Sequence, residues 1–221
     1  MFWFVLGLCW INIMIKAILF DLDGVLVDAC DWHYYALNMS LENNCGIKIS
    51  RNDHETTFNG IPTLKKLEIL EKTGLIHKSD FTKIWEDKQK YTKLSIDKYA
   101  NFDRQKIDMH KKLIKNGYRL ACVTNSIRET ATLMLKNTGQ IDFLEFIITN
   151  EDVKNPKPAS ECYEKACSLM KVKKIETLII EDSEKGYKAA IGSGSHVLRV
   201  KNPNGVNIDA ILGKIKSIEG R

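Results

Sequence analysis

The sequence predicts an α/β fold in which a parallel sheet forms the core and an all-helical segment is inserted after the first strand. Short apolar runs of the kind that form buried strands alternate with amphipathic runs of helical period. Strands that alternate with helices form βαβ units and therefore a parallel sheet. One long stretch interrupts this alternation, because residues 31–99 contain no strand-like run.

The expected elements of the core follow one another in a regular order. The strands are predicted at residues 15–20, 119–123, 143–149, 177–180 and 196–200. The helices between them are predicted at residues 103–116, 128–138, 159–170 and 184–192. Gly117 and Gly139 follow the first two of these helices, where glycine commonly ends a helix. The segment after Val200 is expected to form a turn and a closing helix.

The inserted stretch has the period of amphipathic helices. Leu67, Leu70 and Ile84 lie on such apolar stripes, and Gly60 and Pro62 interrupt the pattern. We therefore expect a core domain made of residues 14–30 and 100–221, with a helical subdomain made of residues 31–99.

The first 13 residues are almost wholly apolar and carry no charge. They lack the basic start of a signal peptide and are too short for a membrane span. We expect Met14 to be the functional start and residues 1–13 to be an upstream extension of the reading frame. A weak hydrophobic anchor is the alternative, and we expect no stable membrane association.

Composition indicates an ordinary globular protein. The chain has 221 residues, 44% hydrophobic and 28% charged, with a formal net charge of +5. This mild positive excess is spread along the chain, so it favours anionic small molecules over nucleic acid as partners. The six cysteines show no CxxC pair or zinc spacing, which is typical of reduced thiols in the cytoplasm. A monomer is expected.

Two carboxylates follow the first predicted strand. Asp21 and Asp23 are one residue apart, so they point to the same side just beyond the strand. The carboxyl ends of parallel strands are where open α/β sheets place their ligands. Two carboxylates there repel one another unless a cation neutralises them. A magnesium site or a nucleophile for covalent phosphoryl transfer would account for both.

Polar residues also mark three later positions. Thr124, Asn125 and Ser126 follow the second strand, Lys157 lies between two prolines before a helix, and Glu181 and Asp182 follow the fourth strand. Each has an ordinary alternative: Ser126 could cap the next helix, Lys157 could be solvated, and the acidic pair could simply begin a helix. Their joint occurrence at strand ends favours one shared site.

These four motifs, in this order, resemble the haloacid dehalogenase-like (HAD) superfamily over residues 14–200. The sequences DLDGVLVD and IEDSEKGYKAA are most similar to the branch of β-phosphoglucomutases and small-molecule phosphatases, which carry a helical cap on a Rossmann-like core. The resemblance implies that Asp21 is the nucleophile and Asp23 the general acid and base. It also implies that Mg²⁺ is held by Asp21, the backbone carbonyl of Asp23, Asp182 and Glu181. Thr124, Asn125 and Lys157 would contact the phosphoryl group.

The resemblance places substrate recognition in the cap. It implies that His33 hydrogen-bonds Asp23 or the substrate, although a partly buried helical histidine is an equal alternative. The loop around Gly60 resembles the cap loop that faces the active site. Mutases of this branch usually carry an arginine just after that glycine, whereas this chain has only Lys65 and Lys66 further on, which could equally form a solvated helix face.

The function that follows is a magnesium-dependent phosphatase that acts on a small phosphorylated metabolite, expected to be a sugar phosphate, through an aspartyl-phosphate. The alternative is a phosphosugar mutase similar to β-phosphoglucomutase, in which a sugar hydroxyl replaces water as the acceptor. A binding or regulatory module without activity is a third interpretation. None of the expected catalytic positions has lost its functional residue, so the sequence does not favour it. The presence of Asp23 argues against dehalogenation. The substrate itself is not specified by the sequence.

Overall fold

The computed structural model of the chain describes residues 13–220, and nearly all of the apolar extension predicted at residues 1–13 lies outside them. Five parallel strands form one sheet in the order β3-β2-β1-β4-β5. Their bounds are β1 (Ala17–Phe20), β2 (Arg119–Val123), β3 (Ile147–Ile148), β4 (Thr177–Glu181) and β5 (His196–Arg199). The chain leaves β1 to one side and later returns to its other side. In open α/β sheets, this reversal creates a crevice at the carboxyl ends of the strands.

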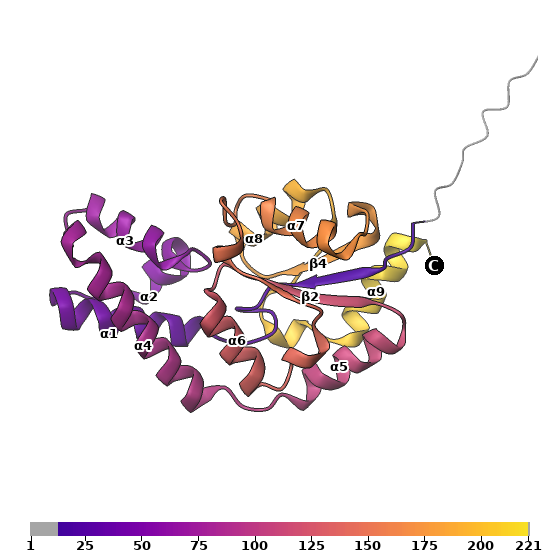
Figure 1. The fold of residues 1–221 in the computed structure, drawn as a ribbon, viewed down its shortest axis with the longest axis horizontal. Helices are drawn as coiled ribbons and strands as arrows, with labels where there is room; N and C mark the ends of the chain where they lie inside the picture. Colours follow the sequence, from indigo (N-terminus) through magenta and orange to yellow (C-terminus); the bar gives the residue numbers. More distant parts are fainter. Residues whose placement is uncertain (1–12, 221) are drawn as a thin grey trace, which may run out of the picture.

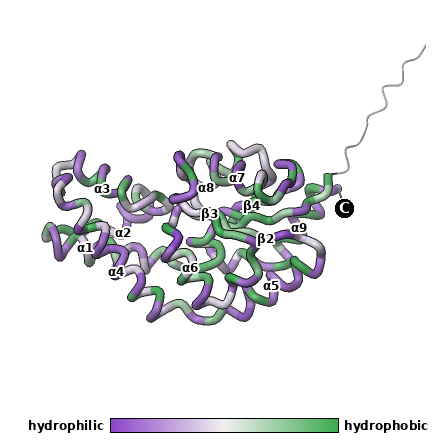
Figure 2. The backbone as a smooth tube through the Cα atoms, in the orientation of Figure 1, coloured by the Kyte–Doolittle hydropathy of each residue, from purple (hydrophilic) through white to green (hydrophobic). Residues whose placement is uncertain are grey.

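Helices cover both faces of the sheet, as Figure 1 shows. Ile18 and Phe20 of β1 belong to one apolar cluster, and Ala17 and Leu19 belong to the other, as expected for side chains that alternate along a strand. All four residues of β1 are accordingly buried, and much of the sheet has the green colour of hydrophobic residues in Figure 2. The first cluster includes α5 (Arg104–Lys115), α6 (Arg128–Asn137) and α9 (Ile208–Glu219), and the second includes α7 (Glu161–Met170) and α8 (Glu184–Ser193).

The inserted stretch, residues 31–99, consists of helices joined by loops, contains no strand, and lies beside the carboxyl edge of the sheet (Figure 1). Its helices are α1 (Cys30–Cys45), α2 (Arg51–Asp53), α3 (Thr63–Lys72) and α4 (Phe81–Tyr99), and a π-helical turn spans His54–Phe58. It has an apolar cluster of its own, which includes Leu37, Leu41, Leu67 and Ile84. The predicted fold class, a parallel α/β core with an inserted helical cap, is therefore confirmed.

The third strand is the element that differs most from prediction. A strand was expected over residues 143–149, but β3 contains only Ile147–Ile148, and Ile141–Phe143 form a short 3-10 turn. This strand lies at the edge of the sheet and pairs only with β2, so fewer ladder bonds fix its length. The other predicted strands and helices agree to within two residues at either end. Between residues 13 and 220, no helix is long and apolar enough to cross a membrane.

A buried histidine lies under the sheet. His110 of α5 lies edge-on to Phe20 and is stacked on Phe143, with ring centroids 5.3 and 5.9 Å apart. Its Nε2 is 3.1 Å from Gln140 Oε1, and its Nδ1 has no hydrogen-bond partner among residues 13–220. Burial lowers the pKa of His110 to about 4, against a weaker effect of the Gln140 hydrogen bond. The folded protein therefore holds this ring in its neutral form.

This burial predicts a specific acid sensitivity. Between pH 6.5 and 4 the unfolded chain binds a proton at His110 that the folded chain does not, so stability is lost as the pH falls through this window. Unfolding in urea at a series of pH values should show the free energy of unfolding falling by about 3 kcal/mol more in the parent than in His110→Gln over this window. Equal pH slopes for the two proteins would contradict this prediction.

Candidate active site

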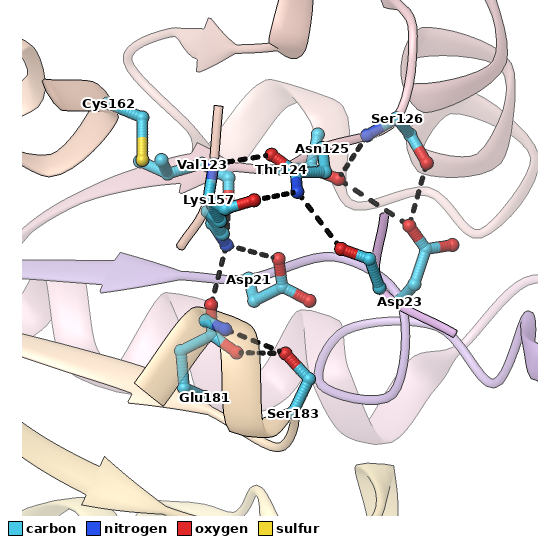
Figure 3. Close-up of polar contacts among 12 residues, drawn as sticks. Asp21, Asp23, Val123, Thr124, Asn125, Ser126, Lys157, Cys162, Glu181 and Ser183 are labelled. Atoms are coloured by element: carbon cyan, nitrogen blue, oxygen red, sulfur yellow. Dashed lines mark hydrogen bonds and ion pairs between the residues drawn. The ribbon is translucent and has the colours of Figure 1, made fainter. Parts of the chain in front are cut away.

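The polar residues predicted at strand ends lie together at the carboxyl edge of the sheet. Asp21 and Asp23 follow β1, residues 124–126 follow β2, and Glu181 is the last residue of β4. The register explains this, because Phe20 pairs with both Cys122 and Ile180 and the three strands therefore end at one level. Lys157 reaches the same place from the loop before α7 (Figure 3). A small pocket of about 30 Å³ is lined by Asp21, Asp23, Thr124, Lys157 and Asp182, among others.

Lys157 is the centre of this cluster. Its side chain is 3% exposed, and its Nζ donates to Asp21 Oδ1 at 2.6 Å, Glu181 Oε1 at 2.6 Å and the carbonyl oxygen of Val123 at 2.8 Å. The hydroxyl of Tyr163 donates to the same Glu181 oxygen at 2.6 Å. Burial alone would lower the pKa of Lys157, but the charges of Asp21 and Glu181 raise it well above its usual value. The lysine is therefore held in its charged form, and its reading as a solvated loop residue is wrong.

The acidic groups outnumber the buried cation that contacts them. Carboxylate oxygens of Asp21, Glu181 and Asp182 all lie within 4.8 Å of one another. Burial, together with the charges of Glu181 and Asp182, raises the pKa of Asp21 well above its usual value, although Lys157 opposes this. Burial and Glu181 raise the pKa of Asp182 to about 7. Asp182 Oδ1 is buried and has no hydrogen-bond partner among residues 13–220. An oxygen-rich cluster with excess negative charge suits a hard divalent cation such as Mg²⁺.

Gly24 allows the chain to turn tightly against this cluster. Its φ is +88°, a conformation that side chains other than glycine rarely adopt. A Cβ atom at this position would lie 2.0 Å from Asp182 Oδ2. The glycine after the DLD sequence is therefore required both by the backbone conformation and by the position of the Asp182 carboxylate.

Asp23 is surrounded by hydrogen-bond donors. His33 Nε2 lies 2.9 Å from its Oδ1, and Ser126 Oγ donates to its Oδ2 at 2.8 Å. Thr124 Oγ1 is 3.5 Å from the same Oδ2. Burial would raise the pKa of Asp23, but the charge and hydrogen bond of His33, with the Ser126 bond, lower it to about 2. The predicted contact between His33 and Asp23 is present in the structure.

Ser126 corrects one of the sequence readings. It does not cap α6, because the residue before that helix is Ile127 and no side chain caps it. Its hydroxyl instead binds Asp23. Residues 124 and 126 are two positions apart just beyond β2, so their side chains point to the same side of an extended chain. This spacing was the signal in the sequence that both hydroxyls face the site.

Asn125 joins three loops around the site. Its Nδ2 donates to the carbonyl oxygens of Gly60 and Lys157 at 3.0 and 3.1 Å, and its Oδ1 accepts from the Lys157 backbone N–H at 3.0 Å. Lys185 of α8 adds two bonds to the carbonyl oxygens of Thr57 and Asn59, each 3.0 Å long. The cap loop around Gly60 therefore lies at the site, as expected. The Asn125 amide, however, is bonded to protein rather than free for a ligand.

The cap contributes two lysines to the site that sequence reasoning missed or left open. Lys66 of α3 and Lys88 of α4 are 4% and 5% exposed, whereas Lys65 is exposed and pairs with Glu68. The Nζ of Lys88 lies 3.3 Å from His33 Nδ1. Both lysines line a cavity of about 330 Å³ between cap and core. Lys88 lies on the same face of α4 as buried Ile84 and Thr92, which are four residues away on either side. A lysine on the buried face of a helix was the signal in the sequence that could have indicated its role.

Comparison with known proteins agrees with this geometry. A family model described as haloacid dehalogenase-like hydrolase matches residues 18–200. The phosphoglycolate phosphatase of Cupriavidus necator is 26% identical over 231 aligned positions, covering 94% of this chain and 93% of that protein. The pyrophosphatase PpaX of Halalkalibacterium halodurans is 29% identical over 169 positions, covering 76% of this chain and 75% of that protein.

Solved structures show the same fold. A β-phosphoglucomutase from Clostridium difficile superimposes with a TM-score of 0.81 at 23% identity, covering 94% of this chain and all of that one. CbbY from Rhodobacter sphaeroides, in complex with phosphate, gives a TM-score of 0.74 at 20% identity over 84% of this chain and 86% of its own. At these sequence identities the similarity concerns the fold alone, which is the arrangement of core and cap.

The buried ion pairs predict a large effect of removing Lys157. Lys157→Met should lower the free energy of unfolding by about 3–5 kcal/mol, because Asp21 and Glu181 then stay buried without their cation. The loss should be smaller at pH 5 than at pH 8, because Asp21 takes up a proton more readily once Lys157 no longer lowers its pKa. Urea unfolding measures both effects. Lys154→Met, at an exposed position of the same loop, is the matched control and should change stability by no more than about 0.5 kcal/mol.

Proposed function

The chain belongs to the haloacid dehalogenase-like hydrolases, and we propose that it is a magnesium-dependent phosphatase that hydrolyses a small phosphorylated metabolite through an aspartyl-phosphate. The family and its phosphatase relatives make it a phosphoric monoester hydrolase. The metal requirement, the intermediate and the substrate class belong to the proposal. The observation that carries it is the position of Asp21, which shares one small pocket with Asp23, Lys157 and Asp182.

In the proposed mechanism Asp21 is the nucleophile. A carboxylate oxygen of Asp21 attacks phosphorus, the bond between phosphorus and the ester oxygen breaks, and the phosphoryl group becomes attached to Asp21. Water then attacks phosphorus and releases phosphate and the free carboxylate. Lys157 keeps one oxygen of Asp21 in place by its 2.6 Å bond. Thr124 and Lys157 line the pocket where the phosphoryl oxygens would lie, so they are the proposed contacts that stabilise its negative charge.

Asp23 is the proposed general acid and base. With a pKa of about 2, it is a carboxylate in the ligand-free protein, which suits removal of a proton from the attacking water. To act first as an acid, it must take up a proton. A phosphoryl group bound beside it brings negative charge, which raises the pKa of a neighbouring carboxyl group. Asp23 then protonates the leaving alkoxide and regains the water proton in the second step.

Asp21, Asp182 and the backbone carbonyl of Asp23 are the proposed ligands of Mg²⁺, with Glu181 assisting. The fit is supported by the buried, unpartnered oxygen of Asp182 and by the excess of carboxylates over Lys157. When bound, the ion supplies positive charge that offsets the developing charge on the phosphoryl oxygens. Glu181 already binds Lys157 and Tyr163, so its main contribution is to hold Lys157.

The proposed substrate is a small phosphorylated metabolite, with sugar phosphates as the first candidates. Relatives are named for phosphoglycolate and for pyrophosphate, so phosphoesters smaller than a sugar and pyrophosphate itself belong in the same screen. The cavity of about 330 Å³ beside the reactive pocket limits the size of the part of the substrate that the cap encloses. A cytoplasmic location, a monomeric state and the lack of nucleic-acid binding stay predictions.

The first prediction of this proposal concerns Asp21. The parent protein should release phosphate from at least one member of a panel of sugar phosphates and other phosphometabolites, and only when Mg²⁺ is present. Asp21→Asn should reduce this release to the background level, because an amide cannot form the aspartyl-phosphate. Asp28→Asn, at an exposed position of the same segment, is the control and should remain active. Release by Asp21→Asn at the parental rate would exclude the proposed nucleophile.

The same panel separates the phosphatase from the mutase alternative. A mutase transfers the phosphoryl group to a sugar hydroxyl, so it would convert one sugar phosphate to its isomer when a hexose bisphosphate is supplied. Isomer formation without free phosphate would show that the protein is a mutase and not a phosphatase. The mutase activity would still require Asp21.

A further prediction concerns the leaving group. Asp23→Ala should lower kcat/KM for alkyl phosphates, which reports formation of the aspartyl-phosphate, by about 100- to 10,000-fold, because the poor leaving group then departs without a proton. The loss should be much smaller for p-nitrophenyl phosphate, whose phenolate leaves without protonation. Steady-state kinetics on both substrates measure the difference, and equal losses would show that Asp23 is not the general acid.

A further inference from the structure

Two buried cations in the cap have no matching anion. Lys66 and Lys88 are nearly inaccessible, and neither forms an ion pair with a carboxylate anywhere in the described part of the chain. Burying an ammonium group is costly unless it is paired. The cost is visible in their pKa values, because burial lowers that of Lys66 to about 7 and that of Lys88 to about 8.

The two lysines come from different helices but line the same cavity. Lys66 is in the first turn of α3, and Lys88 is in the middle of α4. No side chain caps α3, whose preceding residue is Pro62, and the cavity is also lined by Thr63 and Leu64 of its first turn. Free N–H groups and the helix dipole at such an end add positive potential to that of the lysines.

The two carboxylates that line the cavity, Asp23 and Glu151, form no ion pair with either lysine, and Glu151 accepts from the backbone N–H of Arg128. The two oxygens of Asp23 are already bound by His33 and Ser126. The Nζ of Lys88 lies 3.3 Å from His33 Nδ1, so Lys88 has a polar partner in the protein. The side chain of Lys66 has no such hydrogen bond with any residue between 13 and 220. The protein therefore supplies a polar partner for Lys88 but none for Lys66 among the described residues.

The cavity continues into the reactive pocket. Asp23, Asn59, Gly60 and Asn125 line both, so a single small molecule can extend from one into the other. Apolar groups of Ile61, Pro62 and Trp85 form other parts of the cavity wall and suit a short carbon skeleton. The reacting phosphoryl group would lie at Asp21 and the remainder of the molecule beneath the cap.

We propose that Lys66, assisted by Lys88, binds a second anionic group of the substrate, so that the preferred substrates are phosphomonoesters that also carry a carboxylate or a second phosphate. This inference rests on the proposed phosphatase function for the position of the reacting group. It assigns a role to Lys66 that its neighbour Lys65 cannot share, because Lys65 is exposed and paired with Glu68.

The test measures binding rather than turnover. Asp21→Asn protein with Mg²⁺ is titrated by calorimetry with ligand pairs that differ in the second anion. One pair is 2-phosphoglycolate against 2-hydroxyethyl phosphate, and the other is fructose 1,6-bisphosphate against fructose 6-phosphate. In at least one pair the doubly anionic ligand should bind about 10- to 100-fold more tightly, as expected for charge-assisted hydrogen bonds. The pair with the larger ratio identifies the anionic group as carboxylate or phosphate.

Two second-site variants assign the effect to Lys66. Adding Lys66→Met should reduce the affinity ratio to less than about 3-fold, whereas adding Lys65→Met should leave it as in Asp21→Asn alone. A ratio near one in both pairs overturns the inference even if Lys66→Met does not fold, because that comparison uses intact Lys66. An unchanged ratio in folded Lys66→Met overturns it as well. Phosphate release by the parent is measured separately, so its failure would refute the phosphatase and not the binding result.

Discussion

The ion pairs of Lys157 are the interaction on which the rest of the site depends. Carboxylates at the ends of two neighbouring strands would repel one another in a buried pocket, and Lys157 lies between Asp21 and Glu181 at 2.6 Å from each. Breaking such a buried ion pair leaves a charge without a partner, so the neighbouring residues must hold these side chains in place. Tyr163 fixes Glu181 from α7, and Asn125 fixes the backbone of Lys157. Even Gly186 of α8 serves this arrangement, because a Cβ there would lie 1.9 Å from Glu181 Oε1.

The same edge of the sheet also holds the cap. Two side chains of the core, Asn125 and Lys185, bind carbonyl oxygens of the cap loop at Thr57, Asn59 and Gly60. In the other direction, His33 of α1 reaches from the cap to Asp23. The position of the cap and the charge of Asp23 are therefore coupled. A movement of α1 away from the core would remove the histidine that helps to keep the pKa of Asp23 low.

The core could be predicted from the sequence because its signals are local. Apolar runs and the polar residues that end them fix β1, β2 and β4, and parallel pairing then brings Asp21, Thr124 and Glu181 to one edge. The partners of the polar groups could not be predicted, because they depend on contacts across the fold. Ser126 has the sequence context of a helix cap but binds a residue 103 positions away. Lys66 and Lys65 are neighbours in the sequence, and only the direction of α3 decides which is buried.

On the proposed mechanism, the charges of the two halves explain why a cation would assist the reaction of Asp21. Burial and the charges of Glu181 and Asp182 raise the pKa of Asp21, and so oppose the ionised form that would act as the nucleophile. Lys157 cannot remove this effect alone, because it also binds Glu181. Positive charge added at the free oxygen of Asp182 would lower the pKa of Asp21 and so favour its ionised form. In the cap the sign is reversed, because Lys66 and Lys88 form no ion pair with a carboxylate in the described part of the chain. On the proposed mechanism, the cation and the substrate therefore compensate opposite charge excesses on the two sides of one cleft.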